Sequence, residues 1–150
     1  MLTWQWRSFY ELTLDELYEI LALREQVFTI EQSCRACDVD FHDQHALHLL
    51  GKENNQLTAY SRLFIKSIDY PGAITIGRVL VHANARSKGF GKKMMDEILI
   101  YLKKHDHNAP IIISAQQYLE KFYIDYGFKT ISKPYDDGGI PHIEMRKDHV

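Results

Sequence analysis

Two neighbouring stretches decide the fold, AITIGRVLV at residues 73–81 and RSKGFG at residues 86–91. The first is β-branched and almost wholly apolar, a pattern that predicts a strand. The second opens an amphipathic helix whose apolar face consists of Phe90, Met94, Met95, Ile98, Leu99 and Leu102. Glycines between a strand and a helix let the backbone approach a ligand closely, and the free N–H groups of the first helical turn suit a phosphate.

The residues of the glycine loop exclude two common phosphate motifs. A Walker loop needs Gly in place of Arg86 and Ser or Thr in place of Lys93, and a dinucleotide fingerprint needs a small residue in place of Met94. What remains is R-x-x-G-x-G, with positive charge from Lys88 and Lys92. Glycines that merely permit a turn are the alternative interpretation.

The rest of the chain predicts a mixed α/β arrangement. Thr13 and Glu16 form a capping box, which indicates the start of a helix that we expect over residues 14–30. Further apolar patterns predict strands at 2–7, 48–52, 57–65, 110–113, 128–132 and 140–146, and a helix at 119–126. This order predicts an α/β fold with helices on the faces of a mixed sheet, and the length predicts a single domain over residues 1–150.

Composition excludes several classes of protein. The 150 residues carry a formal net charge of −2, which argues against a dedicated nucleic-acid-binding domain. A membrane span needs a run of about 18 apolar residues, and the sequence contains none. The first residues also lack the pattern of a signal peptide. Two cysteines are too few for a disulfide framework, so we expect a reducing, cytoplasmic location.

The charge is unevenly distributed along the chain. Residues 1–57 hold ten acidic and four basic residues, a net of −6, whereas residues 58–150 hold 14 basic and ten acidic residues, a net of +4. Such a split is compatible with two ligands of opposite charge that meet in one cleft, or with charges scattered over the surface.

A second motif, FYIDYGF at residues 122–128, follows the glycine loop. Taken alone, its aromatic residues predict core packing, and Gly127 predicts the end of a helix. In this order, however, the two motifs and the apolar strand between them resemble the GNAT superfamily of acyl-CoA-dependent N-acetyltransferases over nearly the whole chain. Shorter stretches resemble its ElaA-like branch: Arg24-x-x-Val27-Phe28, Glu31-Gln32, Asp40-x-x-Asp43, Ile76-Gly77-Arg78-Val79, Ala115-Gln116 and Ile140-Pro141-His142.

The resemblance implies a mostly antiparallel, twisted sheet with helices on both faces and a splayed pair of central parallel strands, here 73–81 and 111–115. It also implies acetyl-CoA as the cosubstrate. The glycine loop would bind the pyrophosphate, the end of the preceding strand would pair with the pantetheine arm, and Gln116 stands where many members carry Asn. The implied cofactor-binding residues are Leu80, Val81, Arg86, Ser87, Lys88, Gly89, Phe90, Gly91, Lys92 and Gln116.

Tyr123 matches the residue that the family uses as a general acid. A phenol with an ordinary pKa near 10 is protonated at pH 7 and can donate to a departing thiolate. Backbone N–H groups near Val81 would stabilise the oxyanion of the tetrahedral intermediate. A core aromatic is the alternative interpretation of Tyr123, and Tyr126 is assigned to the core.

The general base is less clearly indicated. Some members carry a Glu on the strand that corresponds to residues 73–81, but this strand has no acidic residue. The candidates are Glu31, Asp40, Asp43 and His48, of which we take Glu31 and His48 as the catalytic candidates. Solvated acids and a structural histidine are the alternatives.

Two arginines within strands, Arg62 and Arg78, need acidic partners. We expect an ion-pair network with the acids of the N-terminal half, which would line the acceptor pocket; recognition of a substrate carboxylate is the alternative. The branch usually carries an acidic residue just before G-I-P-H, but Gly138 stands there in this chain.

The cysteines Cys34 and Cys37 are followed by His42 and His45, a set that could ligate zinc. The spacing is tighter than that of a usual zinc finger, and only the first cysteine recurs in the resembling branch. We therefore expect two ordinary thiols and no metal.

The sequence thus predicts an enzyme that transfers an acetyl group from acetyl-CoA to a primary amine by direct attack in a ternary complex. The acceptor would be a small-molecule amine, a protein N-terminus or a lysine, with no nucleic acid or membrane involved, and a homodimer is one expectation for the oligomeric state. Two alternatives stay open: an acyl-CoA-binding sensor that has lost catalysis, and a zinc-binding interaction domain.

Overall fold

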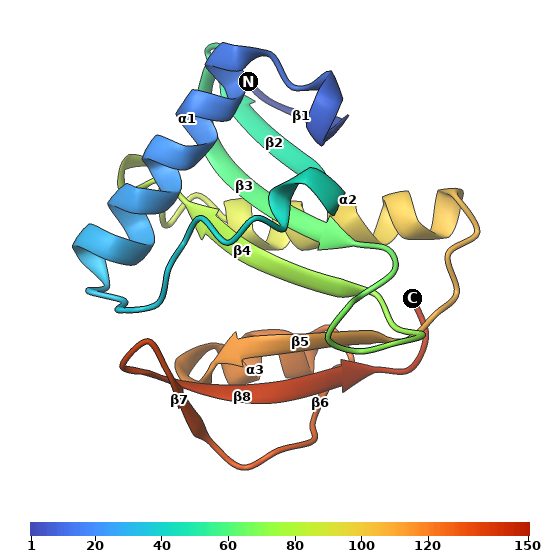
Figure 1. The fold of residues 1–150 in the computed structure, drawn as a ribbon. Coiled ribbons are helices and arrows are strands. Elements are labelled where there is room, and N and C mark those ends of the chain that lie inside the picture. Colours follow the sequence, from blue (N-terminus) through green and yellow to red (C-terminus); the bar gives the residue numbers. More distant parts are fainter.

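The computed structural model describes residues 1–150 as two β-sheets and three α-helices (Figure 1). The first sheet is antiparallel, in the order β1 (Leu2–Ser8), β2 (Leu47–Glu53), β3 (Gln56–Phe64) and β4 (Thr75–Val81). In the second sheet β8 (Ile140–Lys147) pairs with β5 (Ile111–Gln116), β6 (Lys129–Thr130) and β7 (Tyr135–Asp137). The helices are α1 (Leu14–Arg24), α2 (Phe90–Lys104) and α3 (Glu120–Asp125).

The two sheets meet at one parallel bridge between Ile74 and Ile111, just before β4 and at the start of β5. The Ile74 N–H donates to the Pro110 carbonyl at 2.8 Å, and the Ile112 N–H donates to the Ile74 carbonyl at 2.9 Å. Beyond this bridge β4 and β5 separate, as Figure 1 shows. The predicted mixed sheet with splayed central parallel strands is thereby confirmed.

The helices cover opposite faces of the first sheet because its strands alternate apolar side chains between the two faces. Figure 1 shows α1 in front of this sheet and α2 behind it. Under α1 lies a small core of Ile20, Leu23, Val27, Leu50, Leu57, Tyr60 and Leu80. The larger core joins α2 to both sheets through residues such as Leu49, Leu63, Met94, Ile98, Ile113 and Met145.

The predicted N-terminal helix has two parts. The capping box is present, since the Thr13 hydroxyl accepts from the Glu16 N–H and the Glu16 carboxylate accepts from the Thr13 N–H, each at 3.0 Å. The α-helix ends at Arg24, and a π-helical segment, Glu25–Glu31, continues it. Wide π-type turns are common at functional sites, and this segment leads directly into the cleft described below.

One strand is absent from the sequence prediction. β7 forms a hairpin with β8 through Gly138 and Gly139, both with positive φ. Its sequence, Tyr-Asp-Asp, has poor strand propensity, so pairing with β8 defines the strand. No helix in the chain combines the length and apolar character that crossing a membrane requires.

Candidate active site

The separation of β4 and β5 leaves a cavity of about 420 Å³ between the two sheets. Both strands line it, as do the segment between α1 and β2 and the ends of β3 and β8. Tyr123 lines this cavity, and Gln116 lines it at the end of β5. The fold therefore places the predicted acid and a predicted cofactor-binding amide at one cavity.

A β-bulge in β4 shapes the cavity wall. Arg62 pairs with Gly77 and Tyr60 pairs with Leu80, so two residues of β4 lie opposite Ser61 alone. The first of them, Arg78, has a φ of +51°, which is rare for a residue with a side chain. Such a conformation costs about 1–3 kcal/mol and needs surrounding contacts to hold it. A bulge bends its strand, which favours the divergence of β4 from β5.

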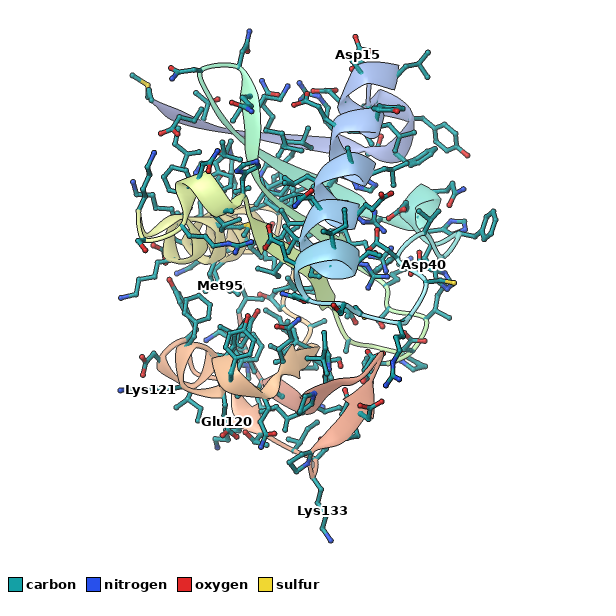
Figure 2. The ribbon with its side chains drawn as sticks, turned by 90° about the vertical axis from the view of Figure 1, so that its left-hand side faces the viewer. Asp15, Asp40, Met95, Glu120, Lys121 and Lys133 are labelled. Atoms are coloured by element: carbon teal, nitrogen blue, oxygen red, sulfur yellow. The ribbon has the colours of Figure 1, made fainter.

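The contacts that hold Arg78 belong to a buried ion-pair cluster. It consists of three arginines and three aspartates, Arg24, Arg62, Arg78, Asp38, Asp40 and Asp43. All three aspartates lie on the segment between α1 and β2, and Figure 2 shows Asp40 beside the C-terminal end of α1. The predicted network of Arg62 and Arg78 with acids of the N-terminal half is thus present, and Arg24 is an additional member.

Arg24 is the most deeply buried member, with no exposed surface. Its Nε donates to an Asp38 carboxylate oxygen at 2.9 Å, its Nη1 donates to Asp43 at 2.8 Å and its Nη2 donates to the Asp38 carbonyl at 2.7 Å. Arg78 binds the same aspartate from the other side, because its Nε donates to the second Asp38 carboxylate oxygen at 2.8 Å. Asp38 therefore ties the end of α1 to the bulge of β4.

Arg62 binds the other two aspartates. Its Nη2 donates to Asp40 at 2.6 Å, and its Nη1 donates to Asp40 and to Asp43, each at 2.9 Å. Burial favours the neutral form of Asp40, but the hydrogen bonds and charge of Arg62 outweigh it and hold the pKa of Asp40 well below its usual range. Both Asp40 and Asp43 were base candidates, and this pairing makes them poor proton acceptors.

The predicted base His48 does not reach the cavity. It is fully buried, and its two ring nitrogens lie 2.6 Å from the Tyr60 hydroxyl and 2.9 Å from the Asp43 carbonyl oxygen. Burial lowers the pKa of His48, so its neutral form is favoured. In this arrangement His48 supports the segment that carries Asp43.

The other predicted base, Glu31, lies at the cofactor side of the cleft. Its carboxylate accepts a hydrogen bond from Arg86 Nη2 at 2.6 Å. The next residue, Gln32, accepts from Gln116 Nε2 at 2.8 Å. Adjacent residues at the end of the π-helical segment thus contact two of the side chains predicted to bind coenzyme A.

The glycine loop forms a second, smaller pocket of about 320 Å³. Ala85 and Phe122 line this pocket together with six predicted cofactor-binding residues of the loop and α2. These six are Arg86, Ser87, Gly89, Phe90, Gly91 and Lys92. Gly89 is the N-cap of α2 with a φ of +75°, and a Cβ there would meet no other atom. The loop backbone is therefore open to a ligand at the start of α2.

Three more predicted cofactor-binding residues differ in their relation to this pocket. Val81 lines it, and its carbonyl accepts from Arg86 Nε at 3.0 Å. Lys88 points elsewhere, since its ammonium group pairs with Glu53 at 3.3 Å. The side chain of Leu80 is buried in the core under α1, so any contact with a cofactor would come from its backbone.

Tyr123 sits on α3 with 5% of its surface exposed. Its ring packs edge-to-face against Phe122 and Phe128, with centroid separations of 5.1 and 5.6 Å. Burial raises the pKa of Tyr123 to about 12. A phenol of this kind stays protonated at neutral pH, as the general-acid role requires.

Cys34, Cys37, His42 and His45, the candidate zinc ligands, do not come together as a metal site. No group of three or more His, Cys, Asp or Glu side chains is placed to hold a metal ion. Cys34 instead lies against the β7–β8 turn, where a Cβ on Gly138 would come within 2.4 Å of its sulfur and 3.0 Å of the Ala36 backbone nitrogen. This close approach leaves no room for a side chain at Gly138, the position where the branch usually carries an acidic residue.

His142 lines the cavity, although the sequence did not indicate it as a general base. It lies on β8 opposite Gln116, and its Nδ1 is 2.7 Å from the Ile140 carbonyl oxygen. In the sequence His142 is part of the stretch Ile140-Pro141-His142. No neighbouring residue distinguishes it from a surface histidine in a hairpin. The pairing of β8 with β5, which brings it to the cavity, is a long-range contact.

A wedge between two parallel strands that opens toward a glycine loop is the arrangement of acyl-CoA N-acyltransferases. The crystal structure of such an enzyme from Pseudomonas aeruginosa superimposes with a TM-score of 0.91 at 36% identity, covering 98% of this chain and 99% of that one. Residues 16–149 match the family model for the acetyltransferase (GNAT) domain. The chain belongs to the GNAT acetyltransferase family.

Relatives of similar length place the chain in the ElaA-like branch. ElaA of Escherichia coli is 36% identical over 152 residues, spanning 100% of this chain and 99% of the relative. Its crystal structure superimposes with a TM-score of 0.90, covering 99% and 100% of the two chains. A UPF0039 protein of Synechocystis is 38% identical over 145 residues, 96% of this chain and 94% of the relative. The resemblance to this branch is thereby confirmed.

Proposed function

We propose that this protein is an acetyl-CoA-dependent N-acetyltransferase that acts on a primary amine. The observation that carries the proposal is Tyr123, a buried phenol with a raised pKa that faces the cavity between β4 and β5. A protonated group at this position can supply a proton to a thiolate leaving group.

Coenzyme A fits the residues that line the cofactor side of the cleft. The first-turn N–H groups of α2 have no acceptor within the helix, and Arg86 and Lys92 add positive charge beside them. The diverging edge of β4 offers backbone groups to the pantetheine amides, as an added strand would. Acetyl-CoA supplies the activated acyl group when bound.

The proposed reaction is direct transfer. The neutral amine attacks the thioester carbonyl, and N–H groups near Val81 stabilise the oxyanion that forms. As the carbon–sulfur bond breaks, the hydroxyl of Tyr123 gives its proton to the sulfur. The acceptor is a small-molecule amine or the amine of a protein N-terminus or lysine.

The rival is an acyl-CoA-binding protein without catalysis. It is favoured by the positions of the predicted bases, because His48 is enclosed and Glu31 is paired with Arg86. Turnover distinguishes the two functions, since a binding protein retains affinity for acetyl-CoA but releases no thiol.

The proposal is tested by calorimetry with acetyl-CoA and by a thiol-release assay over a panel of amines. We expect binding and turnover in the wild-type protein. Tyr123→Phe should lower kcat by about 10²–10⁴-fold, the usual contribution of a general acid, while it retains acetyl-CoA binding. Tyr18→Phe is the control, because Tyr18 is exposed on α1 and lines neither the cavity nor the pocket of the glycine loop. Absence of acetyl-CoA binding would refute the proposal.

A further inference from the structure

His142 stands out because it is held in one orientation at the cavity. Its β8 position pairs with Gln116 of β5 on one side and with Tyr135 of β7 on the other, and its ring stacks on that of Tyr135 with centroids 6.2 Å apart. The side chain lines the same cavity as Tyr123 and is half-buried. Backbone pairing on both sides therefore fixes the position of His142, and the Tyr135 ring lies beside its imidazole.

The hydrogen bond of His142 defines its tautomer. A carbonyl oxygen can only accept, so the 2.7 Å contact with Ile140 requires the proton to reside on Nδ1. In the neutral ring Nε2 then carries a lone pair, and no protein group is bonded to it. An imidazole oriented through one nitrogen with the other free to accept is the usual arrangement of a histidine base.

Four other candidate proton acceptors, Asp40, His42, Glu31 and His48, lack one of these properties. Asp40 is bound by Arg62 and has a lowered pKa. His42 lines the cavity, but its ring is exposed and its backbone, not its ring, is hydrogen-bonded. Glu31 is paired with Arg86, and both nitrogens of His48 are engaged.

We propose that His142 is the general base of the acetyl transfer, an inference that rests on the proposed function. Its Nε2 accepts a proton from the amine as the carbon–nitrogen bond forms. The carbon–sulfur bond then breaks, its electron pair goes to sulfur, and Tyr123 protonates the thiolate. The imidazolium afterwards gives its proton to solvent, and the tyrosinate regains one, so protons balance over the cycle.

The surroundings of His142 include other titratable groups, and its cavity is also lined by Asp38, Asp40, His42, Arg62, Asp69, Tyr70 and Arg78. β7 presents Tyr135 and Asp137, α3 presents Tyr123, and the segment after α1 presents Arg35 beside Gly139 and the thiol of Cys34 beside Gly138. β5 contributes the neutral Gln116. Imidazole is the group in this set that ordinarily titrates between pH 5 and 8. An acid limb of the pH profile in this range therefore reports on histidine.

The decisive variant is His142→Asn. Its amide can still donate to the Ile140 carbonyl, but the acceptor Nε2 is gone. We expect kcat/KM to fall by about 10²–10⁴-fold and the acid limb of its pH profile to disappear, while the acetyl-CoA Kd stays within about twofold of wild type. His45→Asn, an exposed histidine that does not line the cavity, is the control. If His142→Asn fails to fold, as judged by thermal melting, His142→Gln replaces it.

Retention of the wild-type rate and acid limb in His142→Asn would overturn the inference. So would loss of the acid limb in His42→Asn instead. Ring ¹⁵N chemical shifts provide a readout that is independent of turnover: the neutral state must show Nδ1 protonated, and an Nε2–H tautomer contradicts the base role. Acetyl-CoA binding without turnover in the wild-type protein would refute the transferase itself, whereas turnover unaffected by His142→Asn refutes this inference alone.

Discussion

Arg24 and Arg86 both pair with carboxylates of the segment that follows α1, but in opposite surroundings. Arg24 is fully buried and makes three hydrogen bonds to Asp38 and Asp43. Arg86 has 46% of its side chain exposed, and its partner Glu31 has 25% exposed. The comparison teaches that a buried arginine is committed to its partners, whereas an exposed pair can exchange its carboxylate for another anion such as a phosphate.

The buried cluster also changes the meaning of the charge split along the sequence. Three of the ten acids in residues 1–57 are Asp38, Asp40 and Asp43, and they pair with three arginines. The cluster is therefore neutral as a unit. The acidic excess of the N-terminal half is in part an internal structural requirement, so it does not by itself indicate a cationic acceptor.

The largest expected effect is on stability. Arg24→Met should lower the free energy of unfolding by about 3–5 kcal/mol, because it removes three hydrogen bonds to Asp38 and Asp43 and leaves the cluster with two guanidinium groups for three carboxylates. Arg86→Met is the matched control, and its surface pair should contribute no more than about 1 kcal/mol. Urea unfolding followed by circular dichroism measures both. Equal losses in the two variants would contradict the distinction between the two pairs.

A smaller effect concerns the cofactor. Arg86→Met should weaken coenzyme A binding by about 10–100-fold, since a hydrogen bond to a charged group contributes about 1.5–3 kcal/mol. Calorimetric titration gives the dissociation constant. Pantetheine, which lacks the phosphates, serves as the control ligand and should bind both proteins alike. A similar loss of affinity for pantetheine would show that Arg86 has a structural role and does not bind the phosphates.

The smallest effect concerns the partner of Arg86. Glu31→Gln should strengthen coenzyme A binding by up to about fivefold, because the phosphate no longer displaces a carboxylate whose pairing contributes about 0–1 kcal/mol. Asp148→Asn, which breaks the exposed pair with Arg146 far along the chain, removes the same charge as a control. Weaker binding in Glu31→Gln would show instead that Glu31 orients Arg86 for the cofactor.

The sequence predicted the parts of the molecule that local patterns encode. The glycine loop, the capping box at Thr13 and the apolar strand before Gln116 each follow from spacing and propensity within a few residues. The ends of the elements differ more, since the helix expected to residue 30 becomes π-helical after Arg24.

What could not be predicted depends on contacts between distant residues. The segment from 32 to 42 has no periodicity. Its sequence therefore does not predict that Asp38 pairs with Arg24 and Arg78, or that Asp40 pairs with Arg62. His142 reaches the cavity through strand pairing with β5, some 26 positions earlier at Gln116. The arginines within strands did predict that acidic partners must exist, because a buried guanidinium requires them.

The close contact at Gly138 links two segments about a hundred residues apart. The turn between β7 and β8 touches Cys34 and the Ala36 backbone, with no room for a side chain at Gly138. Cys34, Ala36 and Cys37 also line the cavity. A side chain at Gly138 would therefore require the segment that carries Cys34 and Ala36 to move away from the turn. A single position thus couples the β7–β8 hairpin to the segment that lines one side of the cavity.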